Sequence, residues 1–308
     1  MPDPGPDISV VLATWQGERH LRAQLDSLLA QTLPPLEIVA VDDASTDGTL
    51  SILEAYAARD PRVRVFPSAS NQGYVRNFVR GLGLARGAFV APCDQDDVWL
   101  PRKLEVLRSR IGGHPAAYSD SELVDEELRP LGRRMSQVKR QVDVADPLMF
   151  AVGQGAPGHS MLVRRELVQA CLPFPDVLPH DYWMAFQAAG RGGLLYVPEP
   201  LVLYRQHGGN AIGLPGSARR RPRKRTRAER RERIREAMRT MAERCPPGHP
   251  ESQAALRALA RGYEGFTPVH GWVRMATVMR HRDLVFSHKH KSAAARVLSS
   301  LRMLFTID

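Results

Sequence analysis

Three aspartates crowd into the stretch "APCDQDDVWLPRKLE", residues 91–105. Asp94, Asp96 and Asp97 come directly after the apolar run "AFVAP". Like charges so close together repel, so an acidic cluster at the end of a buried strand calls for a cation. Mg²⁺ and Mn²⁺ take carboxylate oxygens together with substrate phosphates. The D-x-D of Asp94 and Asp96 therefore predicts a metal–diphosphate site; the alternative is a solvated turn or cap at the start of a helix.

Strands and helices alternate along the first hundred residues, and this alternation positions the aspartates. Short β-branched runs predict strands at residues 8–13, 36–43, 63–68 and 88–92, and apolar residues at helical spacing predict helices at 18–31, 45–60 and 71–86. The pattern indicates βαβ units around a parallel sheet, in which ligands lie outside the carboxyl ends of the strands. Thr14, Asp42, Asp43 and the cluster at Asp94 all follow strand ends, so we expect them at one edge.

Beyond residue 105 the alternation of strands and helices becomes less regular. The sequence predicts a strand at 116–125, a Gly- and Pro-rich loop near the site at 143–158, a strand passing into a helix at 159–170, and a hairpin-like pair of strands at 192–210. A Pro-initiated helix is expected to carry His180 and Asp181 in its first turn.

Composition indicates an ordinary globular protein of 308 residues, with 43% hydrophobic and 25% charged residues. The three cysteines are widely spaced and form no CxxC pair, so the sequence supports neither a disulfide framework nor a cysteine zinc site and favours a reducing compartment. The first residues lack the pattern of a secretory signal. No run reaches the roughly 18–20 apolar residues of a membrane span.

The net charge of +10 is local. From Arg219 to Arg244 there are thirteen Arg and Lys against four Glu, whereas the other 282 residues are almost neutral. A basic tract runs to Arg225, and a charged helix is predicted from Thr226. We place a domain boundary near residue 213, with an α/β domain at 1–212 and a basic helical extension at 213–308.

Two common nucleotide-binding motifs are absent from the sequence. The turn after the first strand holds the single Gly17 instead of G-x-G-x-x-G, and "GLGLARG" at 81–87 lies late in a helix. No P-loop is present either. The sequence therefore argues against binding of NAD, and of ATP through a Walker motif.

Four segments in order, "ISVVLATWQGERHL", "LEIVAVDDASTDGT", "NQGYVRN" and "CDQDDVWLPRKLE", resemble the nucleotide-diphospho-sugar half of family 2 glycosyltransferases. The resemblance covers about residues 7–212 and is strongest to bacterial rhamnosyltransferase-like enzymes of surface polysaccharide synthesis. It implies the α/β GT-A fold, a Rossmann-like mixed sheet flanked by helices. It also implies inverting, metal-dependent transfer from a UDP- or dTDP-linked sugar.

By that resemblance, Thr14 and Trp15 meet the nucleotide, and the Trp ring can stack on a base. Glu18 matches an acidic residue of the same loop; the alternative, almost as well supported, is a helix N-terminal acid favoured by the dipole. Asp43 matches the residue that accepts from the base. Arg76 matches a position that points at the nucleotide, with a surface arginine as the alternative.

The resemblance also indicates which residues contact the ribose, the diphosphate and the metal ion. Asp94 is expected to meet the ribose or diphosphate, and Asp96 to ligate Mn²⁺ or Mg²⁺. Asp97 is interpreted as a helix cap. His207 is expected at the metal or diphosphate, as an alternative to a solvated loop histidine, and Arg205 is expected to contact the donor in bidentate fashion.

Inverting transfer requires a base for the acceptor hydroxyl, and a carboxylate within hydrogen-bond reach can take the proton. Asp181 matches the family's base at the start of a late helix; the alternative is an ordinary helix N-terminal acid. His180 departs from the family, which often has an acid there, and is expected with His159 on the acceptor side.

The expected acceptor is a polysaccharide or a lipid-linked saccharide. The segment from Arg219 to Arg244 is expected to attract anionic lipid at about 1 kcal/mol per basic residue, which predicts a cytoplasmic protein peripheral at the inner membrane face. Nucleic-acid binding is disfavoured because the tract lacks interleaved aromatics. A non-catalytic sugar-nucleotide-fold protein remains the other alternative, although Asp96 and Asp181 argue against it.

Overall fold

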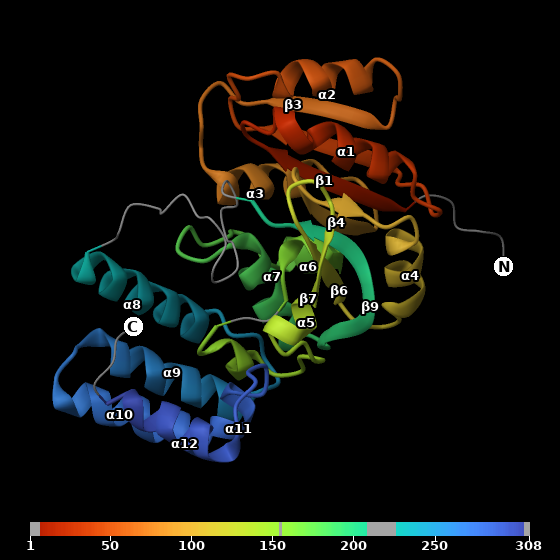
Figure 1. The fold of residues 1–308 in the computed structure, drawn as a ribbon. Coiled ribbons are helices and arrows are strands. Elements are labelled where there is room, and N and C mark those ends of the chain that lie inside the picture. Colours follow the sequence, from red (N-terminus) through yellow and green to blue (C-terminus); the bar gives the residue numbers. More distant parts are fainter. Residues whose placement is uncertain (1–6, 154–155, 208–225, 305–308) are drawn as a thin grey trace.

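The computed structural model describes residues 7–153, 156–207 and 226–304 (Figure 1). A mixed nine-stranded sheet forms its centre, with the strand order β3-β2-β1-β4-β8-β6-β9-β5 and with β7 paired to β6 off this path. The strands are β1 (Ile8–Thr14), β2 (Glu37–Asp42), β3 (Val63–Pro67), β4 (Phe89–Asp94), β5 (Val98–Trp99), β6 (Ala116–Val124), β7 (Pro130–Arg134), β8 (Met161–Arg164) and β9 (Leu194–Arg205).

The first four strands are parallel, and both faces of that part of the sheet are covered. Successive side chains of a strand point to opposite faces, so Val10 packs in one buried cluster and Val11 in the other. Helices α1 (Glu18–Leu29) and α2 (Thr49–Ala57) cover the Val10 face, and α3 (Tyr74–Leu84) covers the Val11 face. The predicted strand–helix alternation is confirmed.

The other half of the sheet is mixed. β8 runs antiparallel to β4 and β6, and β9 runs parallel to β6. The hairpin predicted at residues 192–210 is wrong, because β9 is one long strand. Its register against β6 shifts near Asp120, where Pro198 and Pro200 interrupt the strand without a backbone N–H to donate. The two prolines mark this irregularity within a single strand.

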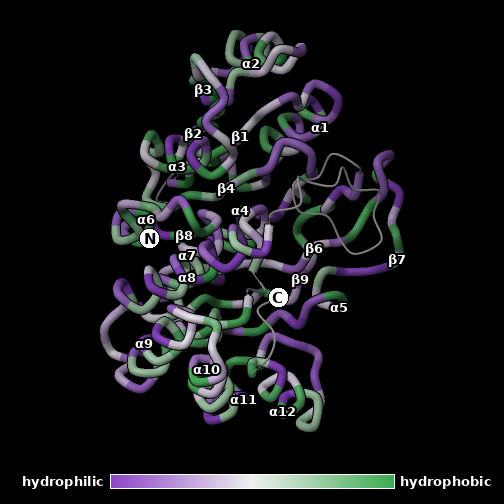
Figure 2. The backbone as a smooth tube through the Cα atoms, turned by 90° about the vertical axis from the view of Figure 1, so that its left-hand side faces the viewer, coloured by the Kyte–Doolittle hydropathy of each residue, from purple (hydrophilic) through white to green (hydrophobic). Residues whose placement is uncertain are grey.

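Short helices connect and cover this half. They are α4 (Lys103–Arg110), α5 (Met135–Val138), α6 (Arg165–Ala170), α7 (His180–Ala189) and the 3-10 helices η1 (Pro147–Phe150) and η2 (Gly158–Ser160). Helix α7 begins after Pro179 with His180 and Asp181 in its first turn, as predicted. Figure 2 shows the contrast between the mainly hydrophilic β7 and the green core strands.

Five helices follow the sheet and form a layer below it in Figure 1. They are α8 (Arg227–Glu243), α9 (Pro250–Glu264), α10 (Pro268–Arg280), α11 (Arg282–Val285) and α12 (Ala293–Arg302). Thr226 caps α8 with Glu229 in a capping box, so the charged helix predicted from Thr226 is confirmed. Met241 and Leu256 of this layer share a buried cluster with Trp183 of α7.

The boundary predicted near residue 213 and the basic tract ending at Arg225 lie outside the described residues. Among the helices that are described, none combines the length and the apolar character needed to cross a membrane.

Candidate active site

The parallel strands bring the predicted polar residues to one edge of the sheet. In the register of the sheet Thr14 of β1 stands beside Asp42 of β2, and Ala13 stands beside Asp94 of β4. Thr14 Oγ1 donates to Asp42 Oδ1 at 2.9 Å, and Asp42 also closes its turn by accepting from the Ser45 hydroxyl at 2.6 Å. The expected common edge is therefore confirmed, and Thr14 and Asp42 are engaged with each other.

Trp15 projects from the end of β1 with 52% of its surface exposed. The side chain of Gln95 holds the Trp15 backbone from both sides: Oε1 accepts from the N–H at 2.8 Å, and Nε2 donates to the carbonyl at 2.9 Å. The residue between the first two aspartates thus fixes the loop that presents the indole. Sequence reasoning did not single out Gln95, whose partner lies 80 positions away.

Glu18 ties two loops together. Its carboxylate accepts from the Gly48 N–H at 2.9 Å, and its own N–H donates to Asp47 at 3.2 Å. Because Gly48 precedes α2, the Glu18 carboxylate caps that helix from the first turn of α1. In this structure Glu18 lies at a helix end, which is the alternative to nucleotide contact that the sequence analysis offered.

Asp43 is buried at the end of β2. Its two oxygens accept from the Gln72 and Gly73 N–H groups at 2.7 and 2.8 Å. Gly73 has φ +87, a left-handed conformation that favours glycine, and it is the N-cap residue of α3. A carboxylate has further lone pairs after two such bonds, so Asp43 retains acceptor capacity.

Arg76 of α3 forms a two-point ion pair with Asp176, at 3.1 and 3.0 Å. Both side chains are well exposed. The guanidinium therefore has a carboxylate partner in this structure, on the segment that leads into α7.

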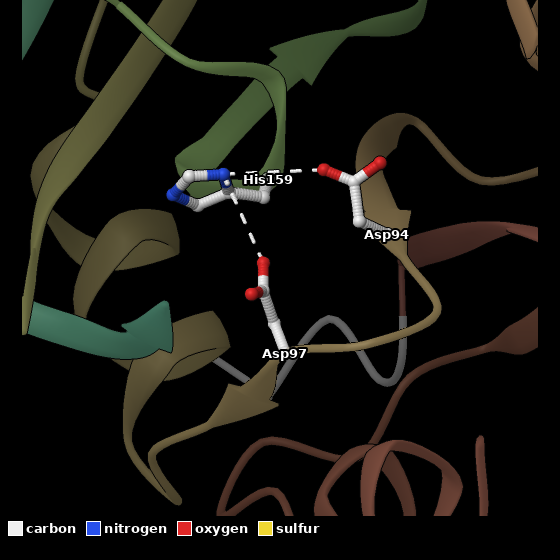
Figure 3. A group of neighbouring side chains, drawn as sticks. All are labelled: Asp94, Asp97 and His159. Atoms are coloured by element: carbon white, nitrogen blue, oxygen red, sulfur yellow. Dashed lines mark ion pairs between the residues drawn. The ribbon is translucent and has the colours of Figure 1, made fainter. Parts of the chain in front are cut away.

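Two of the three aspartates converge with a histidine from a distant segment (Figure 3). His159 Nδ1 lies 3.9 Å from Asp94 Oδ2 and 3.8 Å from Asp97 Oδ2, and one ligand atom of each residue falls within 4.8 Å of the others. The Nε2 of the imidazole is 3.0 Å from the Ser121 hydroxyl, and its ring stacks on Tyr204. These contacts orient Nδ1 toward the carboxylates.

The interpretation of Asp97 as a helix cap is wrong. Its side chain is fully buried, Oδ1 accepts from the Arg205 N–H at 3.1 Å, and α4 begins only at Lys103. Asp97 Oδ2 has no hydrogen-bond partner among the described residues. A buried carboxylate oxygen without a partner is costly, so this atom is a natural ligand for a cation.

The acidic cluster perturbs its own ionisation. Burial, and then the negative charges of Asp96 and Asp181, raise the pKa of Asp94 to about 7, although 44% of its side chain remains exposed. Burial followed by the charges of Asp96 and Asp94 raises the pKa of Asp97. A bound cation would reverse both effects by stabilising the ionised carboxylates.

Lys103 is a buried cation beneath the cluster. Its ammonium donates to the His159 carbonyl at 2.5 Å and lies 3.0 Å from the centre of the Trp99 ring. Burial lowers the pKa of Lys103, whereas Cys93, Asp97 and Asp94 act to raise it. Burial and then the positive charges of Lys103 and Lys139 lower the pKa of His159 to about 3, so its ring is neutral and able to ligate.

Asp96 faces the other predicted metal ligand. Its Oδ2 lies 2.9 Å from His207 Nε2, and the ring of His207 lies 4.9 Å from that of His20. Arg205 is buried and donates to the Asp96 carbonyl at 2.7 Å and to the Glu126 carbonyl. Arg205 therefore supports the backbone of the acidic loop in this structure.

Asp181 approaches the cluster from the start of α7. Its Oδ2 accepts from the Gly158 N–H at 3.1 Å, and its Oδ1 accepts from the Tyr182 N–H at 2.7 Å. A Cβ at Gly158 would lie 3.0 Å from the Asp181 Cβ, so glycine leaves room for the carboxylate. The charge of Asp181 contributes to the raised pKa of Asp94, which places the two carboxylates in one electrostatic site.

His180 is packed inside the protein. It is buried and stacks on Phe78 with ring centres 3.9 Å apart, and neither ring nitrogen has a hydrogen-bond partner among the described residues. Burial lowers its pKa. His159, which was expected with His180 on the acceptor side, lies against the acidic cluster.

The family model described as "Glycosyl transferase family 2" matches residues 9–172. An uncharacterized protein of Mycobacterium tuberculosis is 32% identical over 213 residues, which is 65% of this chain and 59% of that protein. The chain thus spans less than two thirds of the length of its mycobacterial relatives. The dTDP-rhamnosyl transferase RfbG of Shigella flexneri is 26% identical over 66% of this chain and 73% of its own.

Two solved structures show the same fold. S. aureus TarS, in complex with UDP-GlcNAc, has a TM-score of 0.62 and 17% identity over 97% of this chain and 90% of its own. The mannosyltransferase PcManGT from Pyrobaculum calidifontis, in complex with GDP-Man and Mn²⁺, has a TM-score of 0.54 and 22% identity over 97% of this chain and 81% of its own. The GT-A fold expected from the sequence is confirmed.

Proposed function

The chain belongs to glycosyl transferase family 2, and we propose that it is an inverting, metal-dependent hexosyl or rhamnosyl transferase. The proposed donor is a UDP- or dTDP-linked sugar, and the proposed acceptor is a polysaccharide or lipid-linked saccharide. The observation that carries this proposal is the convergence of three carboxylates into one electrostatic site: Asp94 at the end of β4, Asp96 in the loop after it, and Asp181 in the first turn of α7. The likeness to a dTDP-rhamnosyl transferase supports the donor class.

Asp96 and His207 are the proposed metal ligands. They already lie 2.9 Å apart, and the neighbouring group of Asp94, Asp97 and His159 offers a second set of atoms within 4.8 Å. Carboxylate oxygens suit Mg²⁺ and Mn²⁺ alike, and the imidazoles favour Mn²⁺ of the two. The residues fit such an ion, which when bound would neutralise charge on the leaving diphosphate.

Asp181 is the proposed general base. The two backbone N–H groups that its oxygens accept hold the carboxylate in a fixed orientation. A carboxylate so held keeps lone pairs with which to accept the proton of an acceptor hydroxyl as that hydroxyl attacks the anomeric carbon. Attack from the face opposite the diphosphate inverts the anomeric configuration.

The nucleotide is proposed to lie across the ends of β1 and β2. Trp15 presents an exposed ring for stacking on the base, on a loop fixed by Gln95. Asp43 has acceptor capacity left for the base, and Thr14 lines the same edge. In this pose Arg76 would have to leave Asp176 to reach the donor, and Arg205 would act through the backbone of Asp96.

Membrane association through the segment from Arg219 to Arg244 is part of the proposal. Helix α8 contributes six arginines and four glutamates to that segment, and its exposed Arg227 and Arg239 are available for anionic headgroups. A peripheral position at the inner membrane face would bring the enzyme to lipid-linked acceptors.

A transfer assay tests the proposed function. Purified protein is incubated with UDP-, dTDP- and GDP-linked sugars, with Mn²⁺, Mg²⁺ or a chelator, and with lipid-linked saccharide acceptors. We expect metal-dependent release of one nucleoside diphosphate and a product of inverted anomeric configuration by NMR. A product of retained configuration, or equal turnover in chelator, would contradict the proposal.

A further inference from the structure

A basic hollow of about 310 Å³ lies between the segment after α5 and the segment after α11. It is lined by Val138, Lys139, Arg140, His288, Lys289, His290 and Lys291. Six of these seven side chains are lysine, arginine or histidine, and none is acidic. We call this set the basic hollow.

Two hydrogen bonds fasten the two sides of the basic hollow together. Arg140 Nη1 donates to the Ser287 carbonyl at 3.0 Å, and His290 Nε2 lies 3.2 Å from the Ser136 carbonyl. The first bond joins residues 147 positions apart in the chain, and the second joins residues 154 positions apart. The cations are therefore gathered by the fold and are not neighbours on one flexible loop.

Within residues 7–153, 156–207 and 226–304, the Lys and Arg side chains of the basic hollow are not paired with carboxylates. Burial, and then the charges of Lys139 and Lys291, lower the pKa of Lys289. His288 is buried, and its Nε2 has no hydrogen-bond partner in the described part of the chain. Concentrated positive charge and an unpartnered buried polar atom point to an anionic ligand.

Hydrogen bonds link the basic hollow to the candidate active site. His290 contacts the Ser136 carbonyl, the Ser136 hydroxyl donates to Asp120 at 2.6 Å, and the next residue, Ser121, lies 3.0 Å from His159 Nε2. The charge of Lys139 contributes to the lowered pKa of both His288 and His159, so Lys139 lies within electrostatic range of each. Lys289 Nζ would lie 3.3 Å from a Cβ at Gly153, in the segment that leads to η2 and His159. Gly158, at the start of η2, is hydrogen-bonded to Asp181. The basic hollow is therefore connected to the acidic cluster and to Asp181 through η2, on segments separate from the donor-side loops at Trp15 and Asp43.

We infer that the basic hollow binds a phosphate or diphosphate group of the acceptor. This inference rests on the proposed transfer function, because it takes the acceptor to approach Asp181 from this side. Lysine ammonium groups are compact point charges that suit phosphate, and the Arg140 fork adds directional donors. A phosphate held there would place a saccharide hydroxyl of the same molecule toward Asp181.

A calorimetric titration with inorganic diphosphate, in metal-free buffer, tests binding directly. Omitting metal keeps the proposed donor site from contributing. We expect wild type to bind and Lys139→Gln/Lys289→Gln to bind about tenfold or more weakly, since two charge-assisted contacts are removed. The matched control is Arg257→Gln/Arg261→Gln, two exposed arginines of α9. Equal weakening in both variants, or in neither, would overturn the inference.

Kinetics with paired acceptors separate this inference from the proposed function. The Lys139→Gln/Lys289→Gln variant should raise KM for a phosphate-bearing acceptor about tenfold, with little change in kcat, and leave KM for the dephosphorylated acceptor unchanged. An unchanged KM for both acceptors, in an enzyme that still transfers sugar, would overturn the inference alone. Failure to bind any sugar nucleotide would instead overturn the proposed function, while the diphosphate titration is read independently.

Vesicles distinguish an acceptor phosphate from a phospholipid headgroup. Vesicles of phosphatidylcholine with and without phosphatidylglycerol are pelleted with wild type and with both double variants. We expect the Lys139→Gln/Lys289→Gln variant to pellet like wild type. Loss of pelleting in that variant alone, with unchanged affinity for diphosphate, would assign the basic hollow to lipid and contradict an acceptor role.

Discussion

The acidic cluster at Asp94, Asp96 and Asp97 and the basic hollow are opposite in sign and alike in being incomplete. In the acidic cluster the pKa values of Asp94 and Asp97 are raised, and Asp97 Oδ2 has no hydrogen-bond partner among the described residues. In the basic hollow burial and then neighbouring lysines lower the pKa of Lys289, and His288 Nε2 has no hydrogen-bond partner within the described ranges. Uncompensated like charge destabilises a fold, so each region is expected to bind a ligand of the opposite sign.

The two regions differ in how far their charged side chains are buried and held by neighbouring residues. The acidic cluster has a buried counter-ion in Lys103 and an oriented histidine in His159, whereas Lys139 and Arg140 of the basic hollow are exposed. Charges in low dielectric interact more strongly than charges in water. Substitutions in the acidic cluster should therefore have larger effects than substitutions in the basic hollow.

The largest effect is expected from Asp181→Asn. An amide cannot take the acceptor proton, so kcat should fall by about 10²–10⁴-fold, while the dissociation constant of the sugar nucleotide stays as in wild type. Steady-state kinetics and calorimetry measure the two quantities. Glu199→Gln, an exposed position, is the control for loss of one carboxylate. Wild-type turnover by Asp181→Asn would show that another group is the base.

Lys103→Met should destabilise the fold. The change removes the hydrogen bond to the His159 carbonyl and the buried cation next to Asp97, and we expect the free energy of unfolding to fall by about 3 kcal/mol. Denaturant titration measures it. In the double variant Lys103→Met/Asp97→Asn part of the loss should be recovered; strictly additive losses would show that the two groups are uncoupled.

The acidic cluster should make the metal-free protein less stable as the pH rises. The native pKa of Asp94 is about 7 against an ordinary 3.8, so the folded state binds this proton more tightly than the unfolded chain. The stabilising contribution is complete below pH 3.8 and is lost as the pH rises through 7. Relative to wild type, Asp94→Asn should therefore gain stability from about pH 4 to pH 7.

Thermal unfolding of both proteins across that range tests the sign. Mn²⁺ should reduce the difference in stability between wild type and Asp94→Asn, because the ion favours the ionised carboxylate. A difference that is independent of pH would contradict the raised pKa of Asp94.

The smallest effect is expected in the basic hollow. Lys289→Gln relieves repulsion with Lys139 and Lys291, and the melting temperature at low salt should rise by about 1–2 °C. Scanning calorimetry at low and high salt checks this, since screening should abolish the difference. A lowered melting temperature would show that Lys289 has a stabilising partner.

The sequence predicted the first half of the fold well, because each strand there is a short β-branched run and each helix has regular apolar spacing. β9 was missed as a single strand because Pro198 and Pro200 resemble a turn, and only pairing with β6 shows that they mark a register shift. Such pairing depends on contacts that no local pattern encodes.

The site was predicted where a motif is local and missed where residues meet only in the fold. Asp94 and Asp96 share a strand end, so the sequence placed them. Asp97 and His159 meet across 62 positions, and Lys103 reads as an ordinary basic residue of an amphipathic helix until its burial is known. The basic hollow joins two segments about 150 positions apart, whereas the sequence draws attention to the segment from Arg219 to Arg244.

Calorimetric titration with UDP, dTDP and GDP, with and without Mn²⁺, on wild type and Asp96→Ala tests the central claim most directly. The account predicts that one nucleotide binds wild type in the presence of Mn²⁺, and that omission of the ion or the Asp96→Ala change weakens binding by about 100-fold or more. Equal affinity with and without Mn²⁺, or in the folded Asp96→Ala variant, would contradict a metal–diphosphate site at the acidic cluster.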